Sequence, residues 1–184
     1  LFKHVYGKDS YMVGMSCKDF GKSCLHVQSI SHGIKLLFFG TINEYKGLDL
    51  LISAMEQLRK NRIGALIVVE RDNSLHDYIE KSKKIYAEIS SDLLISIFFP
   101  NNPLHDGGVI IQGDKITSAG AVFPTSDNVK ISKRLGTRHR AALGISEEMD
   151  CISLVVSEET GRLSMAVGGE LFYNLTLEEL RLKL

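Results

Sequence analysis

The apolar run at residues 64–70, Gly-Ala-Leu-Ile-Val-Val-Glu, constrains the fold more than any other segment of the chain. Its apolar side chains occupy successive positions rather than alternate ones, so other parts of the protein must cover both faces of a strand formed here. In the segment before it, apolar residues recur at intervals of three and four, as on the buried face of an amphipathic helix. They are Leu48, Leu51, Ile52, Met55 and Leu58. A helix that leads into a doubly covered strand predicts helices packed on a sheet.

Two pairs of strand segments follow, each around a turn. The first pair is residues 109–111 and 116–123, around Gly113 and Asp114, and the second is residues 152–156 and 163–167, around residues 159–161. Helices are expected over 47–62, 73–82 and 91–98, from about 137, and from Thr176, where Thr-Leu-Glu-Glu forms a capping box. We therefore expect an α/β (mixed α+β) fold, with a central mixed or antiparallel sheet flanked by helices.

Residues 1–45 lack sustained periodicity, and we expect them to form a separate N-terminal segment of uncertain structure with a regulatory or assembly role. The domain proper is expected over 46–184. Within the N-terminal segment, Cys17, Cys24 and His26 suggest a partial metal site, but their spacing matches no zinc pattern and a fourth ligand is not evident. Ordinary thiols are the preferred interpretation.

The composition narrows the possible partners and the cellular location. The chain has 22 basic and 22 acidic residues, so no global charge attracts it to nucleic acid, and no such partner is predicted. Three cysteines, an odd number, indicate a reducing compartment, and a cytoplasmic location is expected. No apolar run approaches the roughly 18 residues that span a bilayer. A membrane anchor upstream of Leu1 is left open.

The tripeptide Leu-His-Asp occurs twice, at 75–77 and at 104–106, in two different contexts. The first copy continues into a polar helical pattern, which favours a solvated helix face. The second follows Pro103 and precedes two glycines and an apolar strand, so it lies on a loop where backbone can approach a ligand. There Asp106 can bind a cation or accept a proton, and His105 can ligate or orient. The alternative is that Asp106 and the next glycine only form a turn.

Residues 136–144, Gly-Thr-Arg-His-Arg-Ala-Ala-Leu-Gly, suggest a phosphate site at a helix start. Thr137 is a plausible N-cap, and the free N–H groups there favour anions. Two guanidiniums and an imidazole strengthen that preference. Arg138 and Arg140, however, point about 200° apart on a regular helix, so one contacts phosphate while the other pairs elsewhere. The alternative is a basic, solvated helix start.

Residues 157–161, Ser-Glu-Glu-Thr-Gly, follow the strand at 152–156. A hairpin turn is the preferred interpretation of this segment. The alternative is that Glu158 and Glu159 complete a metal site with His105 or Asp106.

Taken in chain order, these segments resemble the diadenylate cyclase (DAC) domain family. The resemblance extends over residues 47–184 and is carried by residues 62–67, 103–106, 136–141 and 157–161. It implies a mixed sheet flanked by helices, one ATP per subunit, and formation of cyclic di-AMP, a bacterial second messenger, from two ATP with release of pyrophosphate. The family's Asp-Gly-Ala motif lies near the reacting ribose and the metal, and its Arg-His-Arg motif lies near the phosphates.

Carried onto this chain, the resemblance predicts three sets of site residues. The catalytic residues are Asp106, Gly107, Arg138, His139 and Arg140. The ATP-binding residues are Gly107, Gly108, Phe123, Thr137, Arg138, Arg140 and Ser157, with core packing as an equal alternative for Phe123. The ligands of a divalent metal, Mg²⁺ or Mn²⁺, are His105, Asp106 and Glu158.

The chain departs from the family motif at Gly108, which stands where the family has Ala. The expected effect is added backbone freedom, about 0.5–1 kcal/mol, with the carboxylate of Asp106 retained. Because two ATP must face each other, one site per subunit implies a two-fold homodimer, or a higher oligomer built from it. Two alternatives stand beside the cyclase: a nucleotide-binding regulatory domain with weak or no activity, and a metal hydrolase.

Overall fold

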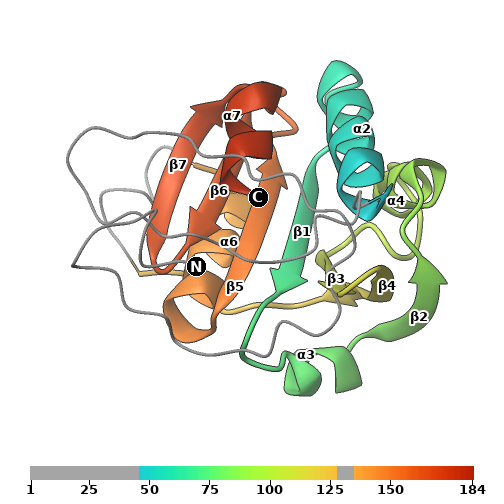
Figure 1. The fold of residues 1–184 in the computed structure, drawn as a ribbon, viewed down its shortest axis with the longest axis vertical. Coiled ribbons are helices and arrows are strands. Elements are labelled where there is room, and N and C mark those ends of the chain that lie inside the picture. The colour runs from blue at the N-terminus through green and yellow to red at the C-terminus, as the bar shows by residue number, and fades with distance from the viewer. Residues whose placement is uncertain (1–45, 128–134) are drawn as a thin grey trace, which may run out of the picture. The chain divides into compact units, whose positions relative to one another are not determined.

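The computed structural model describes residues 46–127 and 135–184 (Figure 1). They form a seven-stranded mixed sheet with the order β2-β4-β3-β1-β5-β6-β7. The strands are β1 (Ala65–Glu70), β2 (Lys83–Glu88), β3 (Gly108–Gln112), β4 (Lys115–Ala121), β5 (Cys151–Val156), β6 (Leu163–Val167) and β7 (Glu170–Leu175). Strands β1 and β3 are parallel, and the other neighbours are antiparallel. The expected fold class is confirmed.

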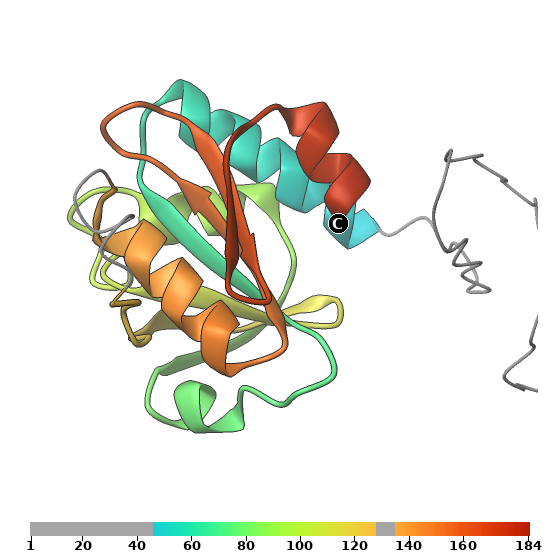
Figure 2. The same ribbon diagram turned by 90° about the vertical axis from the view of Figure 1, so that its left-hand side faces the viewer.

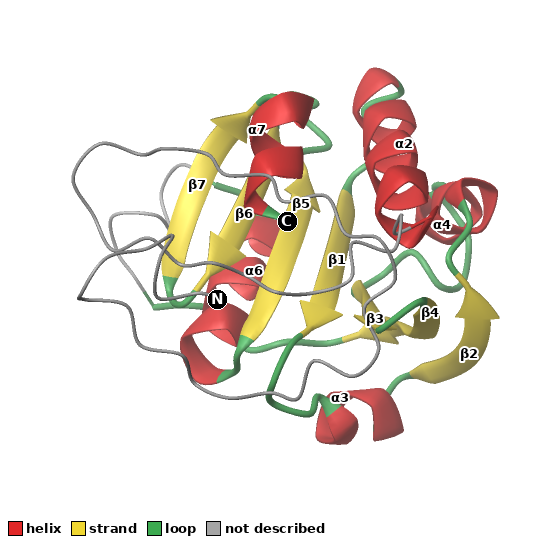
Figure 3. Ribbon diagram, viewed as in Figure 1, coloured by secondary structure: helices red, strands yellow, loops and turns green. Residues whose placement is uncertain are grey.

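Five helices surround this sheet, as Figure 3 shows. They are α2 (Lys46–Lys60), α3 (His76–Glu80), α4 (Ser91–Phe98), α6 (Thr137–Glu148) and α7 (Leu177–Lys183). In the view of Figure 2, α6 lies on one side of the sheet, and α2 and α7 lie on the other. None of the described helices is long and apolar enough to cross a membrane.

The central strand β1 has helices on both of its faces, as its continuous apolar run predicts. Ala65 and Ile67 belong to the core formed with α2 and α4, whereas Leu66 and Val68 belong to the core formed with α3 and α6. Because successive side chains of a strand point to opposite faces, one apolar segment joins both cores. Through its pairing with β5 and β3, the strand connects the element on which α6 packs with the strand that follows the loop at residues 99–107.

Two edge strands were not expected from the sequence. Strand β2 carries charged residues at both ends, so its alternation of polar and apolar residues is weak. The strand is also interrupted by a bulge, where Tyr86 has φ 53°. Charges and bulges are common on edge strands, where they oppose pairing with other chains. Strand β7 follows Gly168 and Gly169, both with positive φ. A Gly-Gly pair between strand-like segments is a hairpin signal, so β7 could have been predicted.

Several predicted element ends are displaced. The helix expected over 73–82 is limited to α3, which starts after Leu75 and has no side-chain cap. The helix expected over 91–98 is confirmed as α4, with Ser90 as its N-cap. The proposed N-cap at Thr137 is wrong, because Gly136 takes the extended cap conformation and Thr137 is the first helical residue. The capping box at Thr176 is confirmed, with Glu179 as its partner. The N-terminal segment, with its cysteines, lies outside the described residues.

Candidate active site

The second Leu-His-Asp copy lies on the loop between α4 and β3, as expected. Asn102 shapes this loop: its side chain donates to the Ser96 carbonyl at 2.7 Å and accepts from the Leu104 N–H at 2.9 Å. The exposed Asp106 lies near the end of this loop, and Gly107 separates it from β3. The first copy differs, because His76 and Asp77 are exposed on α3. That prediction of a solvated helix face is confirmed.

Gly107 is required for the course of the chain after Asp106. Its φ is +101°, and a Cβ there would lie 2.6 Å from the Ala121 carbonyl oxygen on β4. Both the backbone conformation and the lack of space exclude a side chain. The glycine therefore fixes the direction in which the loop enters β3, and with it the position of the preceding carboxylate.

His105 is oriented by its own loop. Its Nδ1 lies 2.6 Å from the Asn102 carbonyl oxygen. A carbonyl oxygen can only accept, so Nδ1 is the donor, and in the neutral form of the ring the lone pair then lies on Nε2. This is the tautomer that a histidine ligand of a metal requires when Nε2 coordinates.

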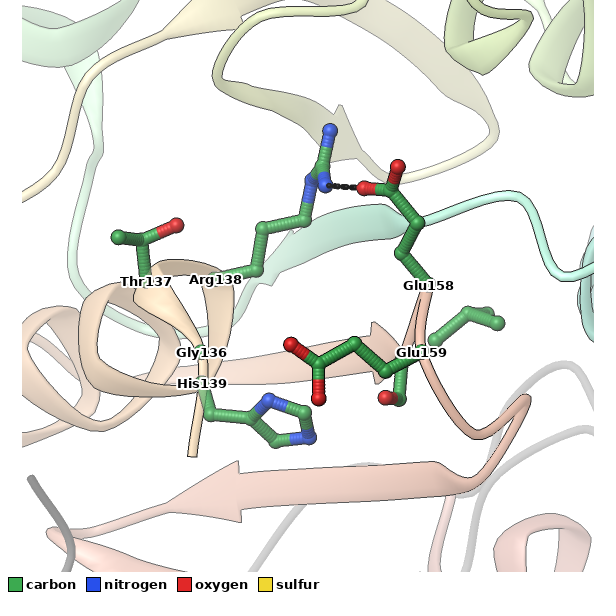
Figure 4. Close-up of a pocket in the computed structure, with 8 residues that line it drawn as sticks. Gly136, Thr137, Arg138, His139, Glu158 and Glu159 are labelled. Carbon is green, nitrogen blue, oxygen red and sulfur yellow. Dashed lines mark hydrogen bonds and ion pairs between the residues drawn. The ribbon is translucent and has the colours of Figure 1, made fainter. Parts of the chain in front are cut away.

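The start of α6 forms one side of a pocket of about 350 Å³ (Figure 4). The lining residues are Gly136, Thr137, Arg138, His139, Val156, Ser157, Glu158 and Glu159. Among residues 46–127 and 135–184, no side chain caps the helix at Gly136, so no capping side chain from this part of the chain satisfies the first N–H groups of α6. A polar pocket at an uncapped start of a twelve-residue helix, with an arginine in its wall, suits an anion.

Arg138 connects the three predicted segments. Its Nη1 lies 3.2 Å from Oε2 of Glu158, and its Nη2 donates to the His105 carbonyl oxygen at 3.4 Å. Figure 4 shows the guanidinium directed toward Glu158. The arginine of the helix start is thus in contact with the residue that precedes Asp106, although 33 positions separate Arg138 from His105. The fold brings together the segments that the sequence keeps apart.

His139 and Arg140 have other surroundings. His139 is buried, its Nε2 lies 3.3 Å from the hydroxyl of Ser164, and burial lowers the pKa of the imidazole below its ordinary value. It is therefore neutral near pH 7 and adds no positive charge to the pocket. Arg140 is not among the described residues that line the pocket, and its carbonyl accepts the N–H of Ser126. Of the two arginines, only Arg138 lines the pocket among the described residues.

The segment after β5 is a turn, as preferred. The Ser157 carbonyl accepts the Gly161 N–H at 2.8 Å, and the Ser157 hydroxyl accepts the Thr160 N–H at 3.3 Å. Glu158 is paired with Arg138 rather than with a cluster of metal ligands. Within residues 46–127 and 135–184, no three His, Cys, Asp or Glu side chains gather closely enough to hold a metal by themselves. The residues fit a metal that is shared with substrate phosphates, which needs only one or two protein ligands.

Phe123 lies in the core, 6% exposed, with its ring 5.4 Å from that of Tyr78. It also occupies the space beside Gly108: a Cβ on Gly108 would lie 2.7 Å from Phe123 Cε2. The expectation that Gly108 only adds backbone freedom is therefore incomplete, because the missing methyl makes room for an aromatic ring. Packing in the core is the role of Phe123 that the described contacts support.

Glu159 lines the pocket, whereas the sequence offers it only as an alternative metal ligand beside Glu158. One further residue near the pocket was missed as a site residue. Gly64, immediately before β1, lies against Arg138 and Glu158. A glycine directly before a doubly covered strand is the available signal for such close packing, since glycine permits the close approach of neighbouring groups.

The chain is similar in sequence to known proteins. Residues 52–171 match the family model of the DAC domain, described as DisA bacterial checkpoint controller nucleotide-binding. The chain is 55% identical to a diadenylate cyclase of Listeria monocytogenes over 133 residues, which are 72% of this chain and 49% of that protein. It is 48% identical to the cyclic di-AMP synthase CdaS of Bacillus subtilis over 173 residues, 94% of this chain and 82% of that protein.

A solved structure shares the fold. DacA from Staphylococcus aureus, crystallised as a double mutant, matches with a TM-score of 0.75 and 48% identity, over 77% of this chain and 94% of that chain. The present chain spans about half the length of the Listeria relative. From residues 52–171 and from these relatives, we conclude that the chain belongs to the DAC family of diadenylate cyclase domains.

Proposed function

We propose that this chain is a diadenylate cyclase, which condenses two ATP into 3′,5′-linked cyclic di-AMP and releases two pyrophosphates. The observation that carries the proposal is the contact between Arg138 and the His105 carbonyl. It places a guanidinium suited to phosphate next to Asp106, the carboxylate suited to a ribose hydroxyl. The names of the relatives support the same chemistry.

In the proposed reaction, the 3′-OH of one ATP attacks the α-phosphorus of the other, and the P–O bond to pyrophosphate breaks. Asp106 is exposed at the end of its loop and accepts the proton of the hydroxyl. Arg138 and the N–H groups at the start of α6 hold phosphate oxygens and stabilise their charge. The protein's contribution is placement and charge stabilisation rather than covalent chemistry.

A divalent metal, Mg²⁺ or Mn²⁺, is proposed as a cofactor, held by His105 and Asp106 together with ATP oxygens. When bound, it supplies neutralisation of charge on the phosphates. Glu158 is a third candidate ligand, and its pairing with Arg138 is the contact that such a role would replace. The orientation of His105 by Asn102 supports the assignment of Nε2 as the ligand atom.

A homodimer is proposed as the catalytic unit, with the option of a higher oligomer built from it. The product is symmetric, and each chain carries one copy of the pocket among its described residues. Two pockets facing each other across a two-fold axis bring each 3′-OH to the other nucleotide's phosphorus. A monomer is then expected to bind ATP without turning it over.

The location and the regulation of the domain are part of the proposal. We propose that the domain works in the cytoplasm. An upstream anchor is compatible with this: a Bacillus cereus protein with a TM-score of 0.66 and 41% identity is described as a hypothetical membrane spanning protein. For residues 1–45 we propose a regulatory or assembly role.

The test is incubation of the full chain with ATP and either Mn²⁺ or Mg²⁺, followed by mass spectrometry of the nucleotides. Cyclic di-AMP with two pyrophosphates per product supports the cyclase. ATP that is bound but unchanged would indicate the alternative, a nucleotide-binding regulatory domain. Release of AMP or ADP without a dinucleotide would indicate a hydrolase and contradict the proposal.

A further inference from the structure

Gly64 lies at the junction between the pocket and the central strand. It is buried and directly precedes β1, whose first residue, Ala65, pairs with Val156 of β5. The pairing sets Gly64 beside the turn that contains Glu158. No predicted site residue lies in this segment, which the proposed reaction does not use.

The space that a side chain at position 64 would take is filled by Arg138. A Cβ built on Gly64 would lie 2.5 Å from Arg138 Nη1, 3.1 Å from Arg138 Cζ and 3.0 Å from Glu158 Cβ. The first of these distances is far inside van der Waals contact. The guanidinium therefore packs directly against the backbone of Gly64. It also contacts the Glu158 carboxylate and the His105 carbonyl oxygen.

A methyl group at this position would displace the arginine rather than the strand. The φ of Gly64 lies outside the left-handed region, so alanine is compatible with the backbone. The most crowded atoms belong to the far end of a long side chain that is one-quarter exposed. The main effect should therefore fall on the guanidinium and only weakly on folding.

We propose that Gly64 is a positioning residue that determines where Arg138 holds phosphate. Because Gly64 has no side chain, the guanidinium of Arg138 occupies the space beside it. In this position the guanidinium lies close to both the pocket and the loop that carries Asp106. Only the predicted effect of Gly64 on ATP binding rests on the proposed function. The placement of the arginine is a separate structural claim.

The experiment uses the full chain with the substitution Gly64→Ala, and two measurements. The first is the NMR signal of the Arg138 side-chain Nε–Hε group without nucleotide, assigned by its loss in Arg138→Ala. The second is the KM for ATP. We expect the signal to move, the KM to rise about tenfold or more, as for loss of a charged hydrogen bond, and the melting temperature to stay nearly unchanged. In an Arg138→Ala background, Gly64→Ala should have no further effect on KM.

The matched control is Gly47→Ala in α2, where a Cβ would lie 3.0 Å from Ile89 Cδ1, a side chain that does not line the pocket. It should leave both the Arg138 signal and the KM unchanged. The inference is overturned by an unmoved signal in Gly64→Ala, by a large fall in melting temperature, or by a full additional effect in the Arg138→Ala background. If the wild-type chain makes no cyclic di-AMP, the proposed function fails, whereas the NMR result still decides the placement of Arg138.

Discussion

The packing of Phe123 beside Gly108 predicts that restoring the family's alanine will destabilise this chain. In Gly108→Ala, the new Cβ would lie 2.7 Å from Phe123 Cε2 and 3.1 Å from both Cγ and the carbonyl oxygen of Leu66. Phe123 is 6% exposed and is backed by Tyr78, so its ring has little space into which to move. The substitution is therefore an overpacking change, even though it adds only one methyl.

The magnitude follows from two opposing terms. Overpacking of a well-filled core costs about 1–3 kcal/mol. Replacing glycine in a strand recovers about 0.5–1 kcal/mol of conformational entropy. With the middle of each range, the net loss should be about 1 kcal/mol in the free energy of unfolding. Phe123→Leu destabilises by itself because it leaves a cavity, but it also opens the space that the alanine needs.

The assay is urea unfolding of four proteins: wild type, Gly108→Ala, Phe123→Leu and the double variant. The two changes should be coupled by about 1–2 kcal/mol, with the double variant more stable than the sum of the single losses predicts. The kcat should fall in Gly108→Ala and recover in the double variant, because β3 begins at Gly108 and supports Asp106. Strictly additive losses, or a Gly108→Ala variant as stable as wild type, would refute the reasoning.

Four further predictions concern the pocket, its surroundings and the N-terminal segment. Asp106→Asn should keep its affinity for ATP in isothermal titration yet lose nearly all cyclic di-AMP formation, and normal product yield would refute the role of that carboxylate. Arg138→Ala should raise the KM for ATP about tenfold or more, whereas Arg181→Ala, which removes an exposed ion pair with Asp49, should not; equal effects would contradict the phosphate role. Burial lowers the pKa of His139 below its ordinary value of 6.5, so only the unfolded chain takes up this proton as the pH falls below about 6.5. Unfolding free energy should therefore decrease below that pH, less steeply in His139→Gln; identical slopes would exclude this source. Removal of residues 1–45 should change turnover or assembly, measured by product formation and light scattering, and no change in either would remove the proposed regulatory role.

The core elements could be predicted from the sequence because each carries its own periodicity. The apolar run of β1 and the three-and-four spacing in α2 are local signals, and both led to the observed elements. Strand β2 could not be recognised in this way, since its residues alternate weakly and its bulge at Tyr86 depends on pairing with β4. Tertiary pairing, rather than local preference, stabilises that edge.

The site was predictable as a set of segments but not as a set of contacts. Glycines, a loop and a basic helix start marked the Asp106 and Arg138 segments. The pairing of Arg138 with Glu158 and the burial of His139 depend on how α6 packs against β5 and β6, and no spacing in the sequence encodes that. The steric roles of Gly64 and Gly108 likewise became visible only with their neighbours in place.

The central claim is that each chain supplies half of each reaction centre, with Asp106 of one subunit acting on a hydroxyl that attacks the phosphate held by the other. The most direct test is a dimer with one wild-type subunit and one Asp106→Asn subunit, isolated through two different affinity tags. In its first turnovers with ATP and Mn²⁺, this dimer should form only one of the two bonds. It should therefore accumulate the linear triphosphate-bearing diadenylate with one pyrophosphate released. Formation of cyclic di-AMP at half the wild-type rate, without the linear product, would contradict the claim.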